Sequence, residues 1–175
     1  MIKKQFNEYK LLGVRMIQSF PPLYGKNPKI LILGSIPGKA SLQAEKYYNN
    51  TRNHFWSLIF EYFKCEQTDD YEIKKSLIVE NGIALWDVIK CCDRENSSLD
   101  SDIKNSKPND INQFLQDNNI MVVFLNGGKA FEEFNRNFKM STIKVIALPS
   151  TSPANANWKK KNCQQKWIDA LNEFL

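Results

Sequence analysis

The sequence predicts an α/β fold: a three-layer α/β/α sandwich around a four-stranded, mostly parallel sheet, in one domain over residues 1–175. Three observations predict it. A length of 175 residues fits one domain. Four short apolar runs alternate with segments of helical periodicity, which indicates βαβ units with right-handed crossovers. Two of these runs are almost continuously apolar, as is typical of strands buried on both faces.

The four apolar runs are the expected strands. The first and third consist almost entirely of Ile, Leu, Val, Met and Phe, whereas the second and fourth are shorter or more mixed. Strands of this kind need helices on both sides of the sheet. In chain order the runs are 29–34 (KILILG), 82–86 (GIALW), 120–125 (IMVVFL) and 143–148 (IKVIAL).

The helices are expected between and after these strands. Residues 53–64 carry apolar side chains at i, i+3, i+4, i+7 and i+8, which form one helix face. Asn53 precedes this face and is a favoured N-cap residue. Four further segments show shorter or amphipathic helical patterns: 75–79, 111–115, 130–134 and 167–175.

Composition narrows the function classes. The net charge of +5 suits a polyanionic partner, although many proteins without one match it. The single histidine, His54, excludes a His-rich zinc site, and four cysteines without a CxxC pair indicate reduced thiols. Residues 1–13 lack the apolar core of a signal peptide, and no apolar run reaches the length of a membrane span. We therefore expect a cytoplasmic, monomeric protein with no metal and no membrane partner.

Small, polar or turn-forming residues follow every expected strand. In open α/β sheets, ligands bind beyond the carboxyl ends of the strands. The four loops would therefore meet at one edge of the sheet and form a site there. These loops are 34–38 (GSIPG), Asp87 with 97–100 (SSLD), 126–128 (NGG) and 149–155 (PSTSPAN).

The loop GSIPG has two interpretations. Its glycines allow close approach, so its backbone amides could bind a phosphate. It lacks the Lys-Ser/Thr ending of a P-loop and the GxGxxG of a dinucleotide fold, so that taken alone the loop is better explained as a plain turn after a buried strand. Asp87 and Asp100 also have two possible roles: each could cap a turn or bind a catalytic water. Their spacing does not indicate the paired-carboxylate site of a sugar hydrolase.

The segment 47–56 (YYNNTRNHFW) crowds aromatic side chains around Arg52 and Asn53. Aromatic faces stack on bases, and an arginine can bind a phosphate. The alternative is structural, with Phe55 in the core, Asn53 as a helix cap and His54 on the surface. Both descriptions can hold together.

Asn126 follows the third strand, and its amide offers one donor group and one acceptor. This pair complements the lactam edge that uracil, hypoxanthine and xanthine share, although Asn-Gly is also a common turn dipeptide. The last loop places serines beside prolines and is followed by lysines at 159–161, a combination suited to DNA phosphates or to a solvated helix start.

Taken together and in this order, the segments GSIPG, YYNNTRNHFW, GIALWDV, SLDSDI, FLNGGKAF and LPSTSPANA resemble the hypoxanthine-DNA glycosylase branch of the uracil-DNA glycosylase superfamily. The resemblance runs from about Ser19 to the C-terminus. It implies a monofunctional hydrolase without metal or organic cofactor. Such an enzyme flips a deaminated base out of the DNA duplex, because the glycosidic carbon is unreachable inside it.

The resemblance also implies roles for individual residues. Asn53 matches the branch's proposed catalytic asparagine, and Asn126 matches the strand-end asparagine that recognises the base. Tyr47, Tyr48 and Phe55 are the expected stacking aromatics. The first motif supplies Gly34, Ser35, Ile36, Pro37 and Gly38, with Ser35 counted among the catalytic residues. The expected DNA contacts are Arg52, Pro149, Ser150, Thr151, Ser152, Pro153, Asn155, Lys159 and Lys160.

Two departures from the superfamily pattern affect the expected substrate. Many members carry Asp or Asn in the first loop, where this chain has Ser35 and Ile36, and many carry a histidine in the last motif, where this chain has none. The departures argue against uracil as the main substrate and leave Asn53 to position water. Two alternatives stay open: a non-catalytic nucleic-acid-binding module, and a small-molecule hydrolase or nucleotide-binding protein that uses GSIPG.

Overall fold

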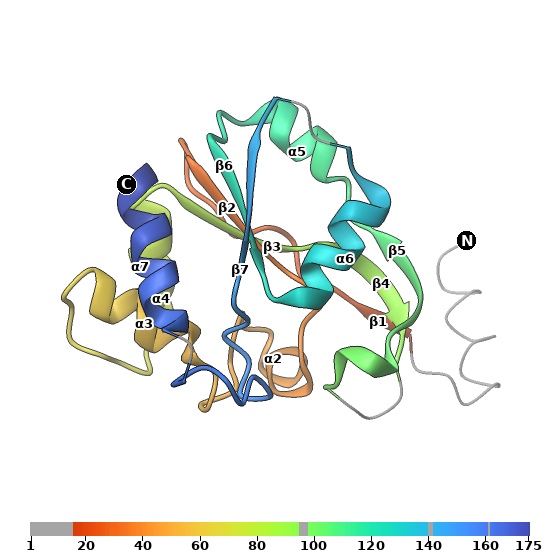
Figure 1. Ribbon diagram of the computed structural model, residues 1–175, viewed down its shortest axis with the longest axis horizontal. Coiled ribbons are helices and arrows are strands. Elements are labelled where there is room, and N and C mark those ends of the chain that lie inside the picture. Colours follow the sequence, from red (N-terminus) through yellow and green to blue (C-terminus); the bar gives the residue numbers. More distant parts are fainter. Residues whose placement is uncertain (1–15, 95–97, 140–141, 161) are drawn as a thin grey trace.

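The computed structural model describes residues 16–94, 98–139, 142–160 and 162–175. Its centre is a four-stranded sheet in the order β3-β2-β6-β7, and all three neighbouring pairs are parallel (Figure 1). The expected fold class is confirmed. Each strand lies within one residue or two of an expected apolar run: β2 (Ile30–Gly34), β3 (Ile83–Asp87), β6 (Val122–Asn126) and β7 (Lys144–Leu148).

The register of the sheet brings the strand ends level with one another. Gly34 pairs with Asp87, and Asn126 pairs with Leu148. The carboxyl ends of the strands point towards the lower edge of the molecule in Figure 1, where α2 (Lys39–Ala44) and the loop after β7 lie. The residues that the sequence placed after each strand therefore meet at one edge.

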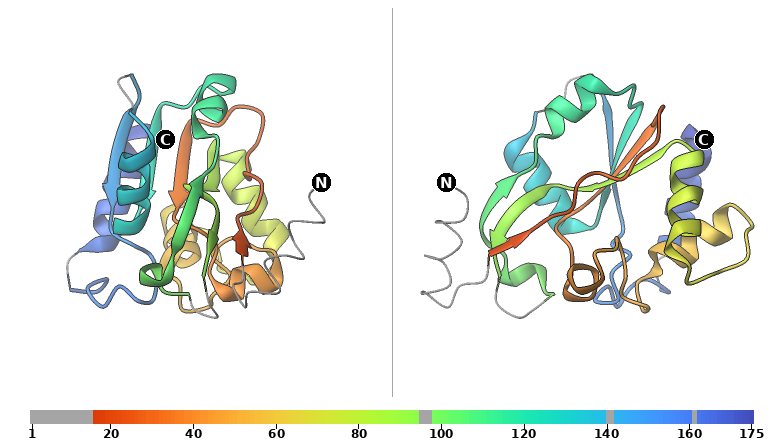
Figure 2. Two further views of the ribbon diagram at one scale, coloured as in Figure 1. Left: turned by 90° about the vertical axis from the view of Figure 1, so that its right-hand side faces the viewer. Right: turned by 180° about the vertical axis from the view of Figure 1, so that it is seen from behind.

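Helices cover both faces of the sheet (Figures 1 and 2). On one face lie α3 (His54–Tyr62), α4 (Tyr71–Glu80) and α7 (Cys163–Phe174). Their apolar side chains pack with Ile30, Ile32 and Phe124 in one core cluster. On the other face, α5 (Ile111–Asp117) and α6 (Gly128–Asn137) pack against Leu31, Leu33 and Leu125. Alternate strand residues thus serve two cores, which explains the continuous apolar runs.

A second, antiparallel sheet was not expected from the sequence. It has the order β1-β4-β5 and is formed by β1 (Met16–Gln18), β4 (Ile89–Asp93) and β5 (Lys104–Pro108). Its strands are short, and β5 (KNSKP) is polar and mostly exposed. The sequence therefore contains no apolar run that would predict this sheet. A short 3₁₀ turn, η1 (Asp100–Asp102), precedes β5 and lies beside the strand ends of the main sheet.

Expectations about the chain's environment were drawn from its cysteines and from its apolar runs. All four cysteines lie in the described residues and are free thiols. Among the helices of the described residues, none is long and apolar enough to span a membrane. Residues 1–13, on which the absence of a signal peptide was argued, lie outside the described residues.

Candidate active site

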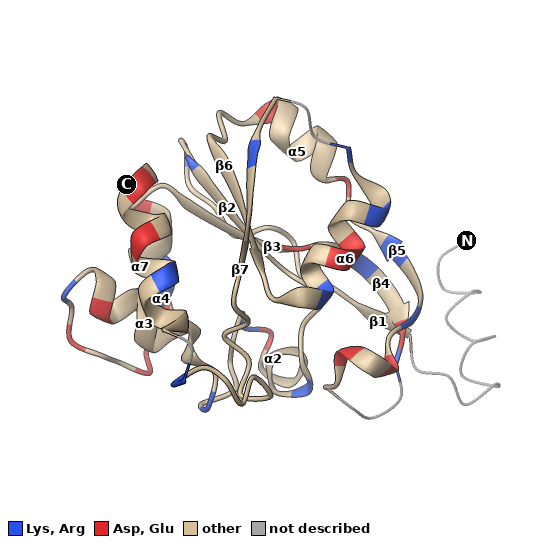
Figure 3. Cartoon of the chain, in the orientation of Figure 1, with Lys and Arg blue, Asp and Glu red and all other residues tan. Residues whose placement is uncertain are grey.

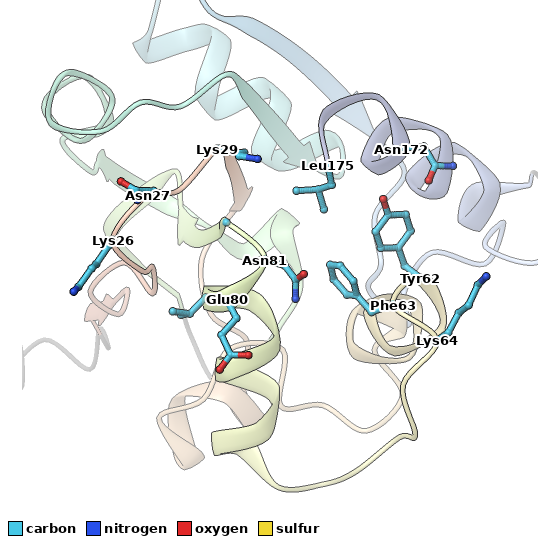
Figure 4. A pocket seen from close by; sticks show the side chains of 12 residues that line it. Lys26, Asn27, Lys29, Tyr62, Phe63, Lys64, Glu80, Asn81, Asn172 and Leu175 are labelled. Carbon is cyan, nitrogen blue, oxygen red and sulfur yellow. The ribbon is translucent and has the colours of Figure 1, made fainter.

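A cavity of about 570 Å³ lies at the carboxyl edge of the parallel sheet. Every loop that the sequence singled out contributes to it, and so does the segment before α3. The lining includes residues 34–41, Tyr47, Tyr48, Asn50, Arg52, Asn53, Asp87, 98–101, Asn126 and 150–154. A larger hollow of about 800 Å³ lies at the opposite edge, between the ends of α3, α4 and α7 (Figure 4).

The first loop is held in place mainly through its backbone. The carbonyls of Gly34 and Ser35 accept hydrogen bonds from the amides of Val88 (2.9 Å) and Ile89 (3.0 Å). Buried Arg94 donates from Nη2 to the carbonyl of Pro37 (2.5 Å). The structure thus fixes the shape of GSIPG from the β3–β4 side and leaves the loop along the cavity wall.

Ser35 and Lys39 contact the segment that carries η1. Ser35 Oγ donates to Oδ1 of Asp100 (2.9 Å), and Ser98 Oγ accepts from the amide of Lys39, the residue after Gly38 (2.9 Å). Burial raises the pKa of Asp100, while Ser35 and Arg94 act in the opposite direction. The pairing of Ser35 with Asp100 was not predicted, because 65 residues separate them.

Asn53 is the N-cap of α3, as the sequence predicts. Its Oδ1 accepts from the amide of Phe55 (2.9 Å), which satisfies one of the unpaired amides at the helix start. The side chain also lines the cavity, and its Nδ2 donates no hydrogen bond within the described residues. The cap therefore orients an amide group whose N–H donors remain available at the cavity wall.

Tyr48 lies in a strained conformation at the cavity wall. Its φ is +52°, a left-handed value that costs a non-glycine residue free energy. Two contacts hold it there: its ring stacks on Phe55 with centroids 3.9 Å apart, and its hydroxyl accepts from Nδ2 of Asn126 (3.2 Å). Burial and the nearby Asp87 raise the pKa of Tyr48, so its hydroxyl keeps its proton.

The expectation that Tyr47 and Phe55 stack on a base needs correction. Phe55 is fully buried and does not line the cavity, since it packs beneath Tyr48 and against Trp56 and Trp167. Tyr47 is only 5% exposed, and its hydroxyl donates to the carbonyl of Pro21 (3.1 Å). Of the three aromatics, Tyr48 is the one whose ring lies half-buried at the cavity.

Asn126 ends β6 at the cavity, but its amide is already engaged. Nδ2 donates to Oγ1 of Thr151 (2.9 Å) and to Oη of Tyr48, and Oδ1 accepts from the amide of Thr151 (2.9 Å). Asn126 therefore does not present the unpaired donor and acceptor that we expected it to offer to a lactam edge. Asn126 instead connects the loop after β7 to Tyr48.

The loop after β7 is built around Thr151, which is fully buried. Its carbonyl accepts from the amide of His54 (2.9 Å), so this loop is also attached to the start of α3. Because its hydroxyl and amide both bond to Asn126, Thr151 is not placed as a phosphate ligand, contrary to expectation. Ser150, Ser152 and Pro153 do line the cavity, where two serine hydroxyls accept from amides of their own loop.

Of the remaining expected DNA contacts, Arg52 lines the cavity, and the others lie around this loop outside it. The carbonyl of Pro149 accepts from Trp167 Nε1 (2.8 Å), and Asn155 Nδ2 donates to the carbonyl of Ser150 (2.8 Å). Lys159 and Lys160 are exposed and do not line the cavity. Arg52 is exposed and does line it. Figure 3 shows basic residues in the loops at the lower edge of the molecule.

His54 is half-buried and packs against another aromatic ring, unlike the plain surface residue that the sequence predicted. Its ring stacks on Trp158 with centroids 4.7 Å apart and planes 1° apart. Burial, and then the charge of Lys159, lower the pKa of His54, so the ring is neutral near pH 7. The stack joins the start of α3 to the chain beyond Thr151.

This arrangement matches known proteins in sequence and in fold. The family model of the Uracil DNA glycosylase superfamily matches residues 21–173. The chain belongs to the uracil DNA glycosylase superfamily.

Relatives within the superfamily cover nearly the whole chain. A Methanosarcina barkeri protein named hypoxanthine DNA glycosylase is 34% identical over 159 residues, which are 88% of this chain and 97% of that one. A protein of the same name from Methanosarcina acetivorans is 36% identical over 86% of this chain and 94% of its own. A solution NMR structure from Methanosarcina acetivorans, described as a candidate uracil DNA glycosylase, has a TM-score of 0.79 at 32% identity. It covers 91% of this chain and 98% of that chain.

Two residues, Arg94 and Asp87, have structural roles in the site that the sequence did not indicate. Arg94 is buried behind GSIPG, where no motif predicts an arginine. Asp87 was expected to cap a turn or bind water, yet the structure buries its carboxyl at the cavity floor beside Gly34. The register of β2 with β3 pairs Gly34 with Asp87 and so places this carboxyl beside the first loop.

Proposed function

We propose that this chain is a monofunctional DNA glycosylase that excises hypoxanthine from deoxyinosine in DNA and leaves an abasic site. The observation that carries the proposal is the cavity at the carboxyl edge, where Tyr48 and Asn53 from the segment before α3 and Asn126 from the end of β6 line the same space. The two relatives named hypoxanthine DNA glycosylase support this choice of base.

The cavity suits a flipped base rather than an intact duplex. Its volume of about 570 Å³ is within the usual range for small-molecule sites. Flipping a nucleotide costs a few kcal/mol, and less for a mispaired base such as hypoxanthine. Selection of the damaged base therefore begins before any contact inside the cavity.

Tyr48 is the group we assign to the lactam carbonyl of the base. Its hydroxyl accepts from Asn126 and donates no hydrogen bond within the described residues, so its O–H is available for a base oxygen. Asn126 orients this hydroxyl and holds Thr151 in place. As the glycosidic bond breaks, negative charge develops on the base, and preorganised donors stabilise it.

Asn53 is the group we assign to the attacking water. An asparagine does not titrate usefully, so it can orient water but cannot act as a general base. The cap on α3 fixes its Oδ1 and directs its N–H donors to the cavity wall. Water held there could capture the sugar carbon as the base leaves. Ser35 also lines the cavity, and its hydroxyl, which donates to Asp100, can still accept a hydrogen bond from the same water or from the sugar.

DNA would lie across the mouth of the cavity. Arg52, Ser150, Ser152 and Pro153 line the cavity, with Asn155, Lys159 and Lys160 beside it. Contacts of this kind bind phosphates without regard to sequence and weaken as salt rises. We infer further that the enzyme acts as a monomer in the cytoplasm, which gel filtration and cell fractionation would test.

Single-turnover base release tests the proposal. The substrates are matched duplexes that carry one deoxyinosine, deoxyuridine or deoxyxanthosine. We expect hypoxanthine to be released fastest. Faster release of uracil would change the assigned substrate, and no release from any duplex would leave a nucleic-acid-binding module without glycosylase activity.

A further inference from the structure

The carboxyl of Asp87 lies at the cavity floor and has no part in the mechanism so far. Asp87 is 5% exposed, ends β3 and pairs with Gly34 in the register of the sheet. A Cβ added to Gly34 would come within 2.6 Å of Asp87 Oδ1 and 3.5 Å of Tyr48 Oη. The missing side chain at Gly34 therefore leaves the space in which this carboxyl and this hydroxyl lie together.

One oxygen of this carboxyl is buried without a partner. Within the described residues, Oδ2 of Asp87 makes no hydrogen bond, and no lysine or arginine lies within ion-pair distance of the group. Arg94 is near enough to act on Asp87 electrostatically, but its Nη2 donates to Pro37. A buried carboxylate in this condition costs far more free energy than a neutral carboxylic acid, whose O–H still needs an acceptor.

We propose that Asp87, as the neutral carboxylic acid, donates its proton to a ring nitrogen of the flipped purine and so acts as the general acid that releases the base. The inference rests on the proposed function and deepens it. Hypoxanthine keeps lone pairs at N3 and N7, whereas both ring nitrogens of uracil in DNA lack one available for protonation. Asp87 would therefore favour hypoxanthine over uracil.

The proposed step balances as a hydrolysis. The bond between C1′ and N9 breaks, and its electron pair goes to the base. The Asp87 proton moves to N7 or N3, so the base departs as neutral hypoxanthine, and the water held by Asn53 forms a bond from oxygen to C1′. That water releases one proton to solvent, and Asp87 regains one from solvent after the base has left.

The electrostatics of the site agree with a protonated Asp87. Burial raises the pKa of this carboxyl to about 7, and Arg94 acts in the opposite direction. Tyr47 and Tyr48, the other titratable groups that face it, stay neutral because burial raises the pKa of each. DNA phosphates raise the Asp87 pKa further when the substrate binds. The rate should therefore be highest below this pKa and fall as the pH rises through it.

The first test is the pH dependence of single-turnover hypoxanthine release between pH 5.5 and pH 9, with about a tenfold fall per unit above the pKa. Asp87→Ala should lower the plateau about 100-fold. The amide of Asp87→Asn donates a hydrogen bond but no proton. Its plateau rate should therefore lie between those of the wild type and Asp87→Ala, and its rate should not fall at alkaline pH. Asp93→Asn, on β4 outside the cavity lining, is the control and should keep the wild-type profile. A flat wild-type profile, or an alkaline fall that persists in Asp87→Asn, would overturn the inference.

The second test removes the proton acceptor from the substrate. Duplexes with 7-deaza- or 3-deaza-deoxyinosine replace one ring nitrogen by C–H. If Asp87 protonates that nitrogen, Asp87→Ala slows release from that analogue far less than it slows release from deoxyinosine. An equal loss on all three substrates would contradict the general-acid role. Failure of the wild type to release hypoxanthine would instead overturn the proposed function on which the inference rests.

Discussion

The protein has hollows at both edges of its parallel sheet, and the smaller one contains the buried and half-buried side chains with unused hydrogen-bonding atoms. The hollow at the amino edge measures about 800 Å³ and the cavity at the carboxyl edge about 570 Å³. At the amino edge, Tyr62, Phe63 and Leu175 face one another, and Lys26 and Lys64 point outward (Figure 4). At the carboxyl edge, Asn53, Tyr48 and Asp87 each keep an unused hydrogen-bonding atom within the described residues.

The difference follows from chain direction. Every parallel strand ends at the carboxyl edge, so loops distant in sequence converge there. The amino edge receives the ends of helices instead: Asn81 caps the end of α4 by donating from Nδ2 to the carbonyl of Leu77 (2.8 Å), and Asn27 and Asn172 are exposed to solvent. Buried or half-buried groups that converge with unused donors or acceptors therefore locate the site, and volume does not.

The largest expected effect comes from Asn53. Asn53→Ala should slow single-turnover hypoxanthine release about 100-fold or more, as loss of one preorganised donor does. It should also cost about 1 kcal/mol of stability through the lost helix cap. Asp70→Ala is the matched control, because Asp70 caps α4 by the same bond to an amide two residues on. It should lose similar stability and keep its rate; equal rates for the two variants would contradict the role of Asn53.

Asn126 and Asn81 are buried or half-buried amides at opposite edges. Asn126→Ala should slow base release about tenfold, because Tyr48 loses its orienting donor, and it leaves the Thr151 amide unpaired at about 1–3 kcal/mol. Asn81→Ala should lower only the free energy of unfolding. Denaturant unfolding and base release, measured on both variants, check the pair; a slower rate in Asn81→Ala would remove the contrast between the edges.

Two glycines allow the same contrast through overpacking. Gly34→Ala would push against Asp87 Oδ1 at 2.6 Å, and Gly25→Ala against Val79 Cγ1 at 2.7 Å. Both should lose about 1–3 kcal/mol of stability. Only Gly34→Ala should also slow base release, by a few-fold or more, because it displaces the carboxyl beside Tyr48. Full activity in Gly34→Ala would show that the position of Asp87 does not matter.

The smallest effect is expected for DNA affinity. Arg52→Ala should weaken binding to duplexes of any sequence and reduce the slope of log K against log salt by about 0.9. Lys64→Ala, at the amino edge, should change neither. Fluorescence anisotropy at several salt concentrations measures both variants, and an equal slope change in the two would place DNA across both edges.

The sequence predicted the parts of the fold that local patterns encode. Residues 30–34 and 122–126 are buried throughout, as their apolar runs predicted. Asn53 as a cap followed from residue type and position alone. The strands β4 and β5 left no such signal, because β4 is mixed and β5 is polar and exposed on an edge.

Partners within the site could not be predicted in the same way. Asn126 bonds to residues 25 and 78 positions away, so its pattern of available donors depends on packing that no local pattern encodes. The burial of Asp87 depends likewise on the register of β3 with β2 and on the missing side chain at Gly34. The sequence thus located the loops of the site and their residue types, but not which hydrogen-bonding atoms remain unused.

One binding measurement tests most directly whether the carboxyl edge holds the base. The ¹⁵N-labelled protein is titrated with a duplex in which 2′-fluoro substitution on deoxyinosine slows cleavage, and with the matched undamaged duplex. We predict that the damaged duplex shifts the amide signals of Gly34, Tyr48, Asn53 and Asn126 beyond the shifts caused by undamaged DNA, while Lys64, Asn81 and Asn172 stay unchanged. Damage-specific shifts confined to the amino edge would contradict the account.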